Sequence, residues 1–226
     1  MSKLIWDATG ERRYETGVSK GVIYFPDETG EYTDGTAWNG LTAVNQAPSG
    51  AEPTKLYADN INYVTLTSLE EFAATIEAYT YPEEFGVCDG TASPIPGVAI
   101  GQQARQLFGF SYQTIVGNDV KGNDFGHKTH LIYGCKAAPS AKDYASVNDS
   151  PEAATFSWEL STNPVYVNEL LKPTAIITLD STILPAAKLQ AVETILYGQD
   201  ATTDPVAPAV VARMPLPAEV LTLLAG

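Results

Sequence analysis

Alternating apolar and polar residues, the pattern of half-buried β-strands, recur through the first 165 positions of this chain. Between the alternating runs lie segments rich in Gly, Pro, Asp and Asn, residue types that favour turns. We therefore expect a mainly-β protein. Strands are predicted at 21–25, 36–44, 61–68, 75–81, 105–118, 126–137, 155–165 and 174–182.

Residues 68–79 fit two patterns. Ser68 and Glu71 have the spacing of a helix capping box, and apolar residues recur at helical intervals after them. The β-branched and aromatic residues at 75–81 instead favour a turn at 69–72 that is followed by a strand. We prefer the second interpretation.

Helical periodicity is clearest near the end of the chain. Leu189, Val192 and Leu196 share one face of a predicted helix at 184–197. Pro185 suits the first turn of this helix, and Gly198 suits the position after its end. A short terminal helix is expected at 218–224.

Three segments are longer and looser than ordinary connections in a compact domain. They lie at 26–36, 43–55 and 199–216, and we interpret them as loops or arms that contact neighbouring subunits. Two prolines and a glycine in the second segment predict a loop that is poorly held by its own core. Its candidate subunit-contact residues are Gln46, Pro48, Ser49, Gly50, Glu52 and Pro53.

A second polar loop is expected where the long runs at 105–118 and 126–137 meet. The pair predicts a hairpin with its tip at 117–126. The candidate residues of this tip are Asn118, Asp119, Lys121, Asn123 and Asp124. They resemble a calcium loop only loosely, because an EF-hand needs a different ligand spacing between two helices.

Composition narrows the functional classes. The 226 residues carry a net charge of −14, and the acids are spread along the chain without a Lys/Arg cluster that would grip phosphates. No apolar run is long enough for a membrane span, and the N-terminus lacks the apolar region of a secretory signal. Cys88 and Cys135 are expected to be free thiols.

The sequence contains few residues in the patterns that are typical of catalytic sites. His127 and His130 are three positions apart in a predicted strand, so they lie on opposite faces, and we expect a surface or strand-edge role for them. The acids at 70–84 could in principle supply a glycosidase pair, although scattered surface acids explain them better. No nucleotide-binding or hydrolase motif is found. We expect no enzyme and no cofactor.

Several stretches together resemble the major tail protein, or tail tube protein, of long-tailed bacteriophages with non-contractile tails. The resemblance covers most of residues 12–165 and continues through LYG and PLPAEV. It is carried by RRYETGVSKGVIY, AWNGLTAVNQAPSGAEPTKLYADN, IEAYTYPEEF with CDG, FSYQTIVGNDVKGNDFGHKTHLIYGCKA and NDSPEAATFSWELSTNPV.

The resemblance implies two packed antiparallel sheets flanked by an α-helix, in a β-sandwich or barrel-like tail tube fold with long loops or arms. It implies a single tube domain over 1–226, in which about 199–226 form a C-terminal arm and a short terminal helix. Hexameric rings of this family stack into a hollow tube that conducts DNA without binding it specifically. The implied partners are further copies, tape-measure and tail-completion proteins, and the implied place is the virion tail, assembled in the host cytoplasm.

A contractile-tail or secretion tube would share this fold. The alternative from another class is a carbohydrate-binding or adhesion β-sandwich, in which Trp6, Trp38 and Trp158 would offer aromatic faces to a sugar. An enzyme is a third, weaker alternative.

Overall fold

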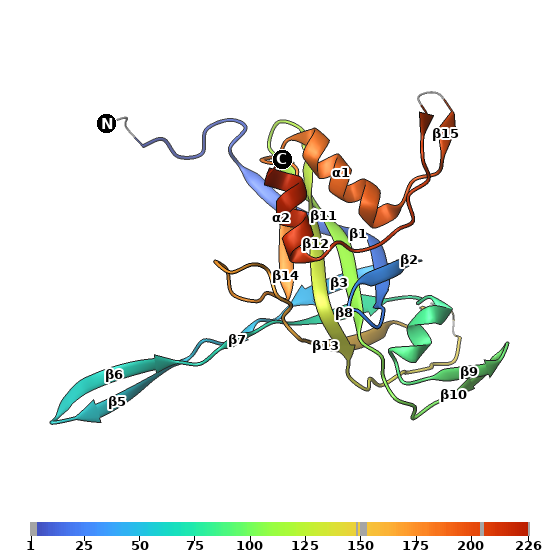
Figure 1. Cartoon of the computed structure of the whole chain (residues 1–226), viewed down its shortest axis with the longest axis horizontal. Helices are drawn as coiled ribbons and strands as arrows, with labels where there is room; N and C mark the ends of the chain where they lie inside the picture. Colours follow the sequence, from blue (N-terminus) through green and yellow to red (C-terminus); the bar gives the residue numbers. More distant parts are fainter. Residues whose placement is uncertain (1–3, 148, 150–152, 204–205, 226) are drawn as a thin grey trace.

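Strands dominate the computed structural model, which describes residues 4–147, 149, 153–203 and 206–225. Within this part of the chain the strand pairs are antiparallel, and two α-helices pack beside the main sheet (Figure 1). The expected mainly-β, sandwich-like fold flanked by a helix is confirmed. No helix among the described residues has the length and apolar character that crossing a membrane requires.

The main sheet has eight strands in the described part of the chain. Its order along the sheet is β2 (Tyr32–Trp38), β1 (Arg13–Pro26), β11 (Phe108–Asn118), β12 (Gly122–Ala137), β13 (Phe156–Thr162), β8 (Ala73–Ala78) and β3 (Leu41–Gln46), with β14 (Ile176–Asp180) paired to β12.

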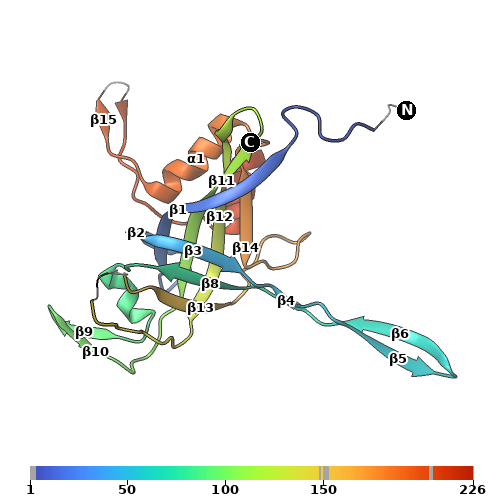
Figure 2. The ribbon, with the colours of Figure 1, turned by 180° about the vertical axis from the view of Figure 1, so that it is seen from behind.

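Strand β12 joins the two layers of this sheet. Its residues 128–132 pair with β14, whereas residues 135–137 pair with β13. Between them, Gly134 has a φ of 59°, and a Cβ there would collide with the carbonyl oxygen of Asn163. The sheet bends here, and β3, β8 and β13 cross over β1, β11 and β12 (Figure 2). Both layers of the sandwich thus belong to one sheet.

An aromatic core fills the space between the layers. The rings of Trp38, Phe85 and Trp158 contact one another with centroid distances of 4.5, 5.1 and 5.4 Å. These residues come from β2, β13 and a 3₁₀ turn, η1 (Glu83–Val87), which closes one end of the core. Edge-to-face rings of this kind add to the burial of large apolar areas.

A second core lies between the sheet and the helices. The buried side chains of α1 (Ala186–Tyr197) are Leu189, Val192 and Leu196, as predicted from their spacing. They pack with sheet residues that include Tyr24, whose hydroxyl donates to the carbonyl oxygen of Leu196 at 2.8 Å. The expected terminal helix is α2 (Pro217–Ala225), and its Val220 is buried in the same core.

The predicted strand at 61–68 and the later strands are present, as is the β11–β12 hairpin. The predicted loop at 26–36 is partly wrong, because β2 begins at Tyr32. The turn is confined to 27–31, where the Asp27 carboxylate accepts hydrogen bonds from the backbone nitrogens of Thr29 and Glu31. Burial of Tyr32 in the helix-side core then fixes the strand.

The predicted loop at 43–55 is also wrong. It contains the end of β3, then β4 (Ser49–Gly50) and the start of β5 (Pro53–Ala58). Pro53 is tolerated because it is the first residue of its strand, where no ladder hydrogen bond is required of its nitrogen. β4 pairs with β7 (Glu70–Glu71), and β5 pairs with β6 (Ile61–Thr67).

Two smaller hairpins complete the description. β9 (Ala92–Ile95) pairs with β10 (Val98–Ile100), and β15 (Thr202–Thr203) pairs with β16 (Val206–Ala207). Residues 204, 205 and 226 of the predicted C-terminal arm, and 148 and 150–152 of the segment before β13, lie outside the described residues.

Candidate assembly surface

A long two-stranded ribbon projects from the body of the protein. This arm, residues 49–71, comprises β4, β5, β6 and β7 and extends away from the main sheet in both views (Figures 1 and 2). Nine residues separate Gly50 from the turn at Asp59, which corresponds to about 30 Å of extended strand. Asp59 and Asn60 have φ values of 51° and 63°, as a tight two-residue hairpin turn requires.

The arm is apolar but has no core of its own. Every residue of β5 and β6 is exposed. Its exposed large apolar side chains are Leu56, Tyr57, Ile61, Tyr63, Val64, Leu66 and Leu69. An isolated two-stranded hairpin is marginal in water, and an exposed apolar patch rimmed by polar residues is typical of a protein contact.

One face of the arm is distinctly aliphatic. Leu56 lies opposite Val64 across the two strands, and Leu66 lies two residues further along β6 on the same face. The neighbouring pair, Lys55 and Thr65, points to the opposite face. By the same alternation this opposite face also carries Ile61 and Tyr63, so it mixes apolar and polar side chains, whereas Leu56, Val64 and Leu66 form an aliphatic stripe on the first face.

The predicted contact residues lie at the base of the arm. Gln46 is part of β3, and its side chain donates to the hydroxyl of Tyr112 at 2.7 Å, which attaches it to the body. Gly50 has a φ of 86°, and a Cβ there would collide with the carbonyl oxygen of Leu69. Glu52 bonds through its backbone nitrogen to Ser68 at 3.2 Å. Pro48, Ser49 and Pro53 complete this set.

Sequence reasoning missed the apolar outer half of the arm. The sequence predicts a loop over 43–55 and a strand over 61–68, whereas residues 53–67 form one exposed hairpin. The signal was present in Asp59-Asn60, a two-residue turn between two extended runs.

The β11–β12 hairpin tip holds the N-terminal segment. The two carboxylate oxygens of Asp119 accept hydrogen bonds from the backbone nitrogen of Gly10, at 3.0 and 3.2 Å. The side-chain amide of Asn118 donates to the Gly10 carbonyl oxygen at 3.1 Å. Asn123 accepts the hydroxyl of Tyr14 at 2.8 Å. Lys121 donates its backbone nitrogen to Asn118 at 2.7 Å, and Asp124 bonds back to Lys121. Asn118, Asp119 and Asn123 thus bind residues of the N-terminal region, whereas Lys121 and Asp124 bond within the tip.

Among the described residues, no group of three or more His, Cys, Asp and Glu side chains could hold a metal ion. The surface or strand-edge role expected of His130 is wrong. Its ring stacks on Tyr112 at 4.6 Å and bonds to Thr114 and Thr178, and burial lowers its pKa. His127 lies apart on the other face, bonded to Glu193 at 2.8 Å.

Cys88 and Cys135 are free, as predicted, and both are buried. Burial raises the pKa of the Cys88 thiol to about 12 and also raises the pKa of Cys135. A nucleophilic cysteine needs a lowered pKa and some exposure. The two thiols are therefore core residues.

The three tryptophans do not form the aromatic surface that the sugar-binding alternative requires. Trp38 and Trp158 are 3% and 0% exposed and belong to the inner core, whereas Trp6 is 76% exposed on a different segment. The three rings therefore do not share a surface.

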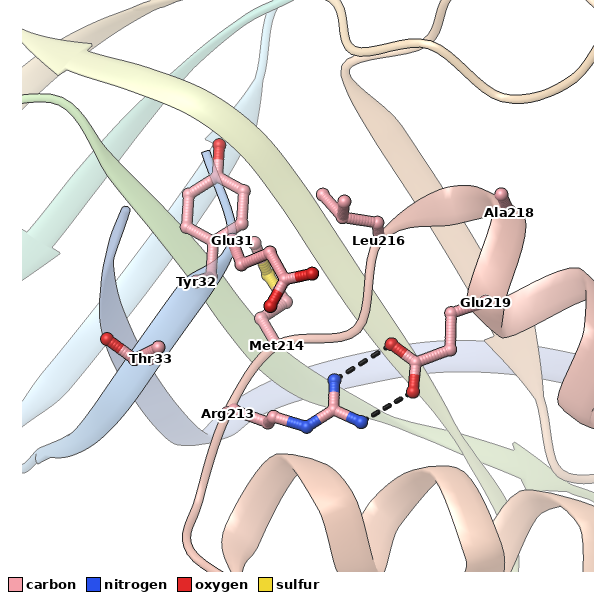
Figure 3. Close-up of a pocket in the computed structure, with 8 residues that line it drawn as sticks. All are labelled: Glu31, Tyr32, Thr33, Arg213, Met214, Leu216, Ala218 and Glu219. Atoms are coloured by element: carbon pink, nitrogen blue, oxygen red, sulfur yellow. Dashed lines mark hydrogen bonds and ion pairs between the residues drawn. The ribbon is translucent and has the colours of Figure 1, made fainter. Parts of the chain in front are cut away.

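A cavity of about 200 Å³ lies between β2 and the start of α2 (Figure 3). The guanidinium of Arg213 donates to both carboxylate oxygens of Glu219, at 2.8 and 2.5 Å, as Figure 3 shows. This bidentate pair raises the pKa of Arg213 and fastens the segment before α2 to that helix. We assign this cavity a structural role.

No protein-family model and no curated protein matches this chain.

Proposed function

We propose that this chain is a structural protein whose copies assemble into rings that stack as a hollow tube, in the manner of a phage tail tube. The observation that supports this best is the exposed arm at 49–71. Its aliphatic face leaves Leu56, Val64 and Leu66 in water in an isolated chain. These three residues are 44%, 39% and 53% exposed. Burying their exposed part against another copy contributes about half of the 1.5–3 kcal/mol that full burial of such a side chain gives, which favours assembly.

The position of the arm favours a head-to-tail contact. The arm extends about 30 Å from the sheet, which is far enough to reach the body of a neighbouring copy, and we propose that it contacts that body and not a second arm. A contact between two different patches generates closed rings or open filaments. The hexameric ring follows from the resemblance to tail tube proteins, and the arm supplies a physical means of joining copies.

The proposed partners follow from the same reasoning. They are further copies of the chain, tape-measure and tail-completion proteins, and DNA that passes through the lumen. The net charge of −14 disfavours tight binding of a polyanion. The proposed place is the virion tail, assembled in the host cytoplasm, and the proposed role requires no catalysis, cofactor or membrane.

The test compares the wild type with two single variants of the arm. Val64→Asp places a charge on the aliphatic face, and Thr65→Asp places the same charge on the opposite face. After concentration, the wild type forms rings or tubes visible by negative-stain electron microscopy. Val64→Asp remains small on size-exclusion chromatography, and Thr65→Asp assembles better than Val64→Asp. A wild type that stays monomeric, or a Val64→Asp variant that assembles normally, contradicts the proposal.

A further inference from the structure

A second exposed apolar segment lies far from the arm. Leu4, Ile5 and Trp6 are 72%, 79% and 76% exposed, although they are consecutive large apolar residues. They belong to the N-terminal segment (residues 4–12), which precedes β1 and leaves the body on the side opposite β2 (Figures 1 and 2). An aromatic side chain can bury about 150–250 Å² at a contact, and nothing in the described part of the chain covers these three residues.

The root of this segment is fixed. The Gly10 nitrogen and carbonyl oxygen are both bonded to the β11–β12 hairpin tip, and Asp119 donates its backbone nitrogen to the carbonyl oxygen of Arg12 at 3.2 Å. The residues before Gly10 can therefore move only about this fixed point, because hydrogen bonds hold the backbone of Gly10. Four residues separate Trp6 from Gly10, which limits its reach to about 14 Å of backbone.

A groove with a largely apolar lining lies beside the middle of β1, at residues 20–22. Its volume is about 410 Å³, and it runs between β2 and the end of α1. Its lining includes Lys20, Val22, Ala37, Trp38, Tyr197 and Ala212. A cavity of about 150 Å³ binds benzene, so this groove has room for an indole ring together with an aliphatic side chain.

The charges at the two sites are opposite. The ammonium group of Lys20 lies over the ring of Tyr197, 5.4 Å from its centroid, at the edge of the groove. Asp7 follows the apolar tripeptide directly and is exposed. An indole seated in the groove would bring the next residue of its chain close to Lys20.

The segment cannot reach the groove of its own chain. Arg13 pairs with Asn118 of β11, and Val22, which lines the groove, pairs with Ser111, so seven steps along β11 separate the groove from the root of the segment, which corresponds to about 23 Å. The pinned segment reaches only about 14 Å and points the other way. Its occupant, if it comes from this segment, must come from another copy.

We propose that the N-terminal segment of one copy docks in this groove of a neighbouring copy, with the Trp6 indole among the apolar side chains and the Asp7 carboxylate beside Lys20. The contact joins two different patches and is therefore head-to-tail. The inference rests on the proposed self-assembly and adds a second contact to the arm.

The direct test uses the full-length Trp6→Ala protein, whose groove is free, and a fluorescein-labelled peptide SKLIWDATG. Fluorescence anisotropy rises and saturates as this protein is added, whereas a peptide with Ala in place of Trp does not respond. Lys20→Glu in the protein weakens binding about tenfold, and a peptide with Lys in place of Asp restores it. Absence of saturable binding, or binding that Lys20→Glu leaves unchanged, overturns the inference.

A second measurement separates this inference from the proposed function. If the wild type forms tubes and Trp6→Ala does not, both the docking of the N-terminal segment and the proposed function are supported. Normal tubes from Trp6→Ala overturn the docking and leave the proposed function standing. Peptide binding by a protein that never forms rings or tubes supports the docking and overturns the proposed function.

Discussion

The carboxylate of Asp89 accepts a hydrogen bond from the indole nitrogen of Trp158 at 3.2 Å. The same carboxylate is 2.7 Å from the ammonium of Lys142 and 3.7 Å from the guanidinium of Arg105. Its side chain is 9% exposed. Asp89 therefore joins the inner core to two segments outside the main sheet and is the anion that faces both of their cations.

Removal of this carboxylate is expected to destabilise the protein. Asp89→Ala leaves the buried indole N–H of Trp158 without its acceptor and removes the anion that Lys142 and Arg105 share. We expect a loss of about 2–4 kcal/mol in the free energy of unfolding. Urea denaturation measures the loss. Asp143→Ala, which removes an exposed carboxylate nearby in the sequence, is the control and should change stability by less than about 0.5 kcal/mol. Equal effects of the two variants would contradict this role.

Truncation of Leu196 tests the packing of α1. The side chain is 0% exposed in the helix-side core, so Leu196→Ala should lower stability by about 2–5 kcal/mol. Leu170→Ala is the matched control, because Leu170 is 92% exposed. A loss below about 0.5 kcal/mol for Leu196→Ala would mean that this helix face is not part of the core.

The stability of the fold is expected to fall in mild acid. Burial lowers the pKa of His130 below its ordinary value of 6.5, so the unfolded chain binds a proton more readily than the folded one. The contribution of neutral His130 is complete above about pH 6.5 and is lost as the pH falls through the lower pKa of the folded state. Unfolding free energies of the wild type and His130→Gln should converge as the pH falls from 7 towards 5. A difference that is independent of pH would refute this linkage.

The assembled protein is expected not to retain duplex DNA. A conduit lined with Lys and Arg would bind DNA tightly, whereas a chain of net charge −14 can present acids to the lumen. Screening over about 8 Å at physiological salt leaves the sign of the potential near the wall unchanged. Co-sedimentation of tubes with duplex DNA at about 50 mM salt should leave the DNA in the supernatant. DNA that pellets with the tubes and is released by added salt would contradict the expectation.

The elements with regular periodicity could be predicted from the sequence. The spacing of Leu189, Val192 and Leu196 identified α1, because a helix that packs on a sheet buries one stripe. The β11–β12 hairpin was predictable because two alternating runs flank a short polar tip. In both cases the pattern of burial is local, so the sequence alone carries it.

The arm and the bend depend on information that is not local. The strands of the arm face solvent on both sides, so no core imposes an alternation on residues 53–67. The bend at Gly134 is required by the approach of Asn163, which only the folded chain brings near. His130 was misplaced for the same reason, since the pairing of β14 with β12 is what encloses it.

The most direct measurement of the central claim is a cryo-electron microscopy reconstruction of the assembled protein. We expect six copies in each ring, with the aliphatic face of the arm, including Leu56 and Val64, buried against another copy, and an excess of Asp and Glu over Lys and Arg on the inner surface. An arm that stays in solvent in the assembled tube, or a lumen rich in Lys and Arg, would contradict the account.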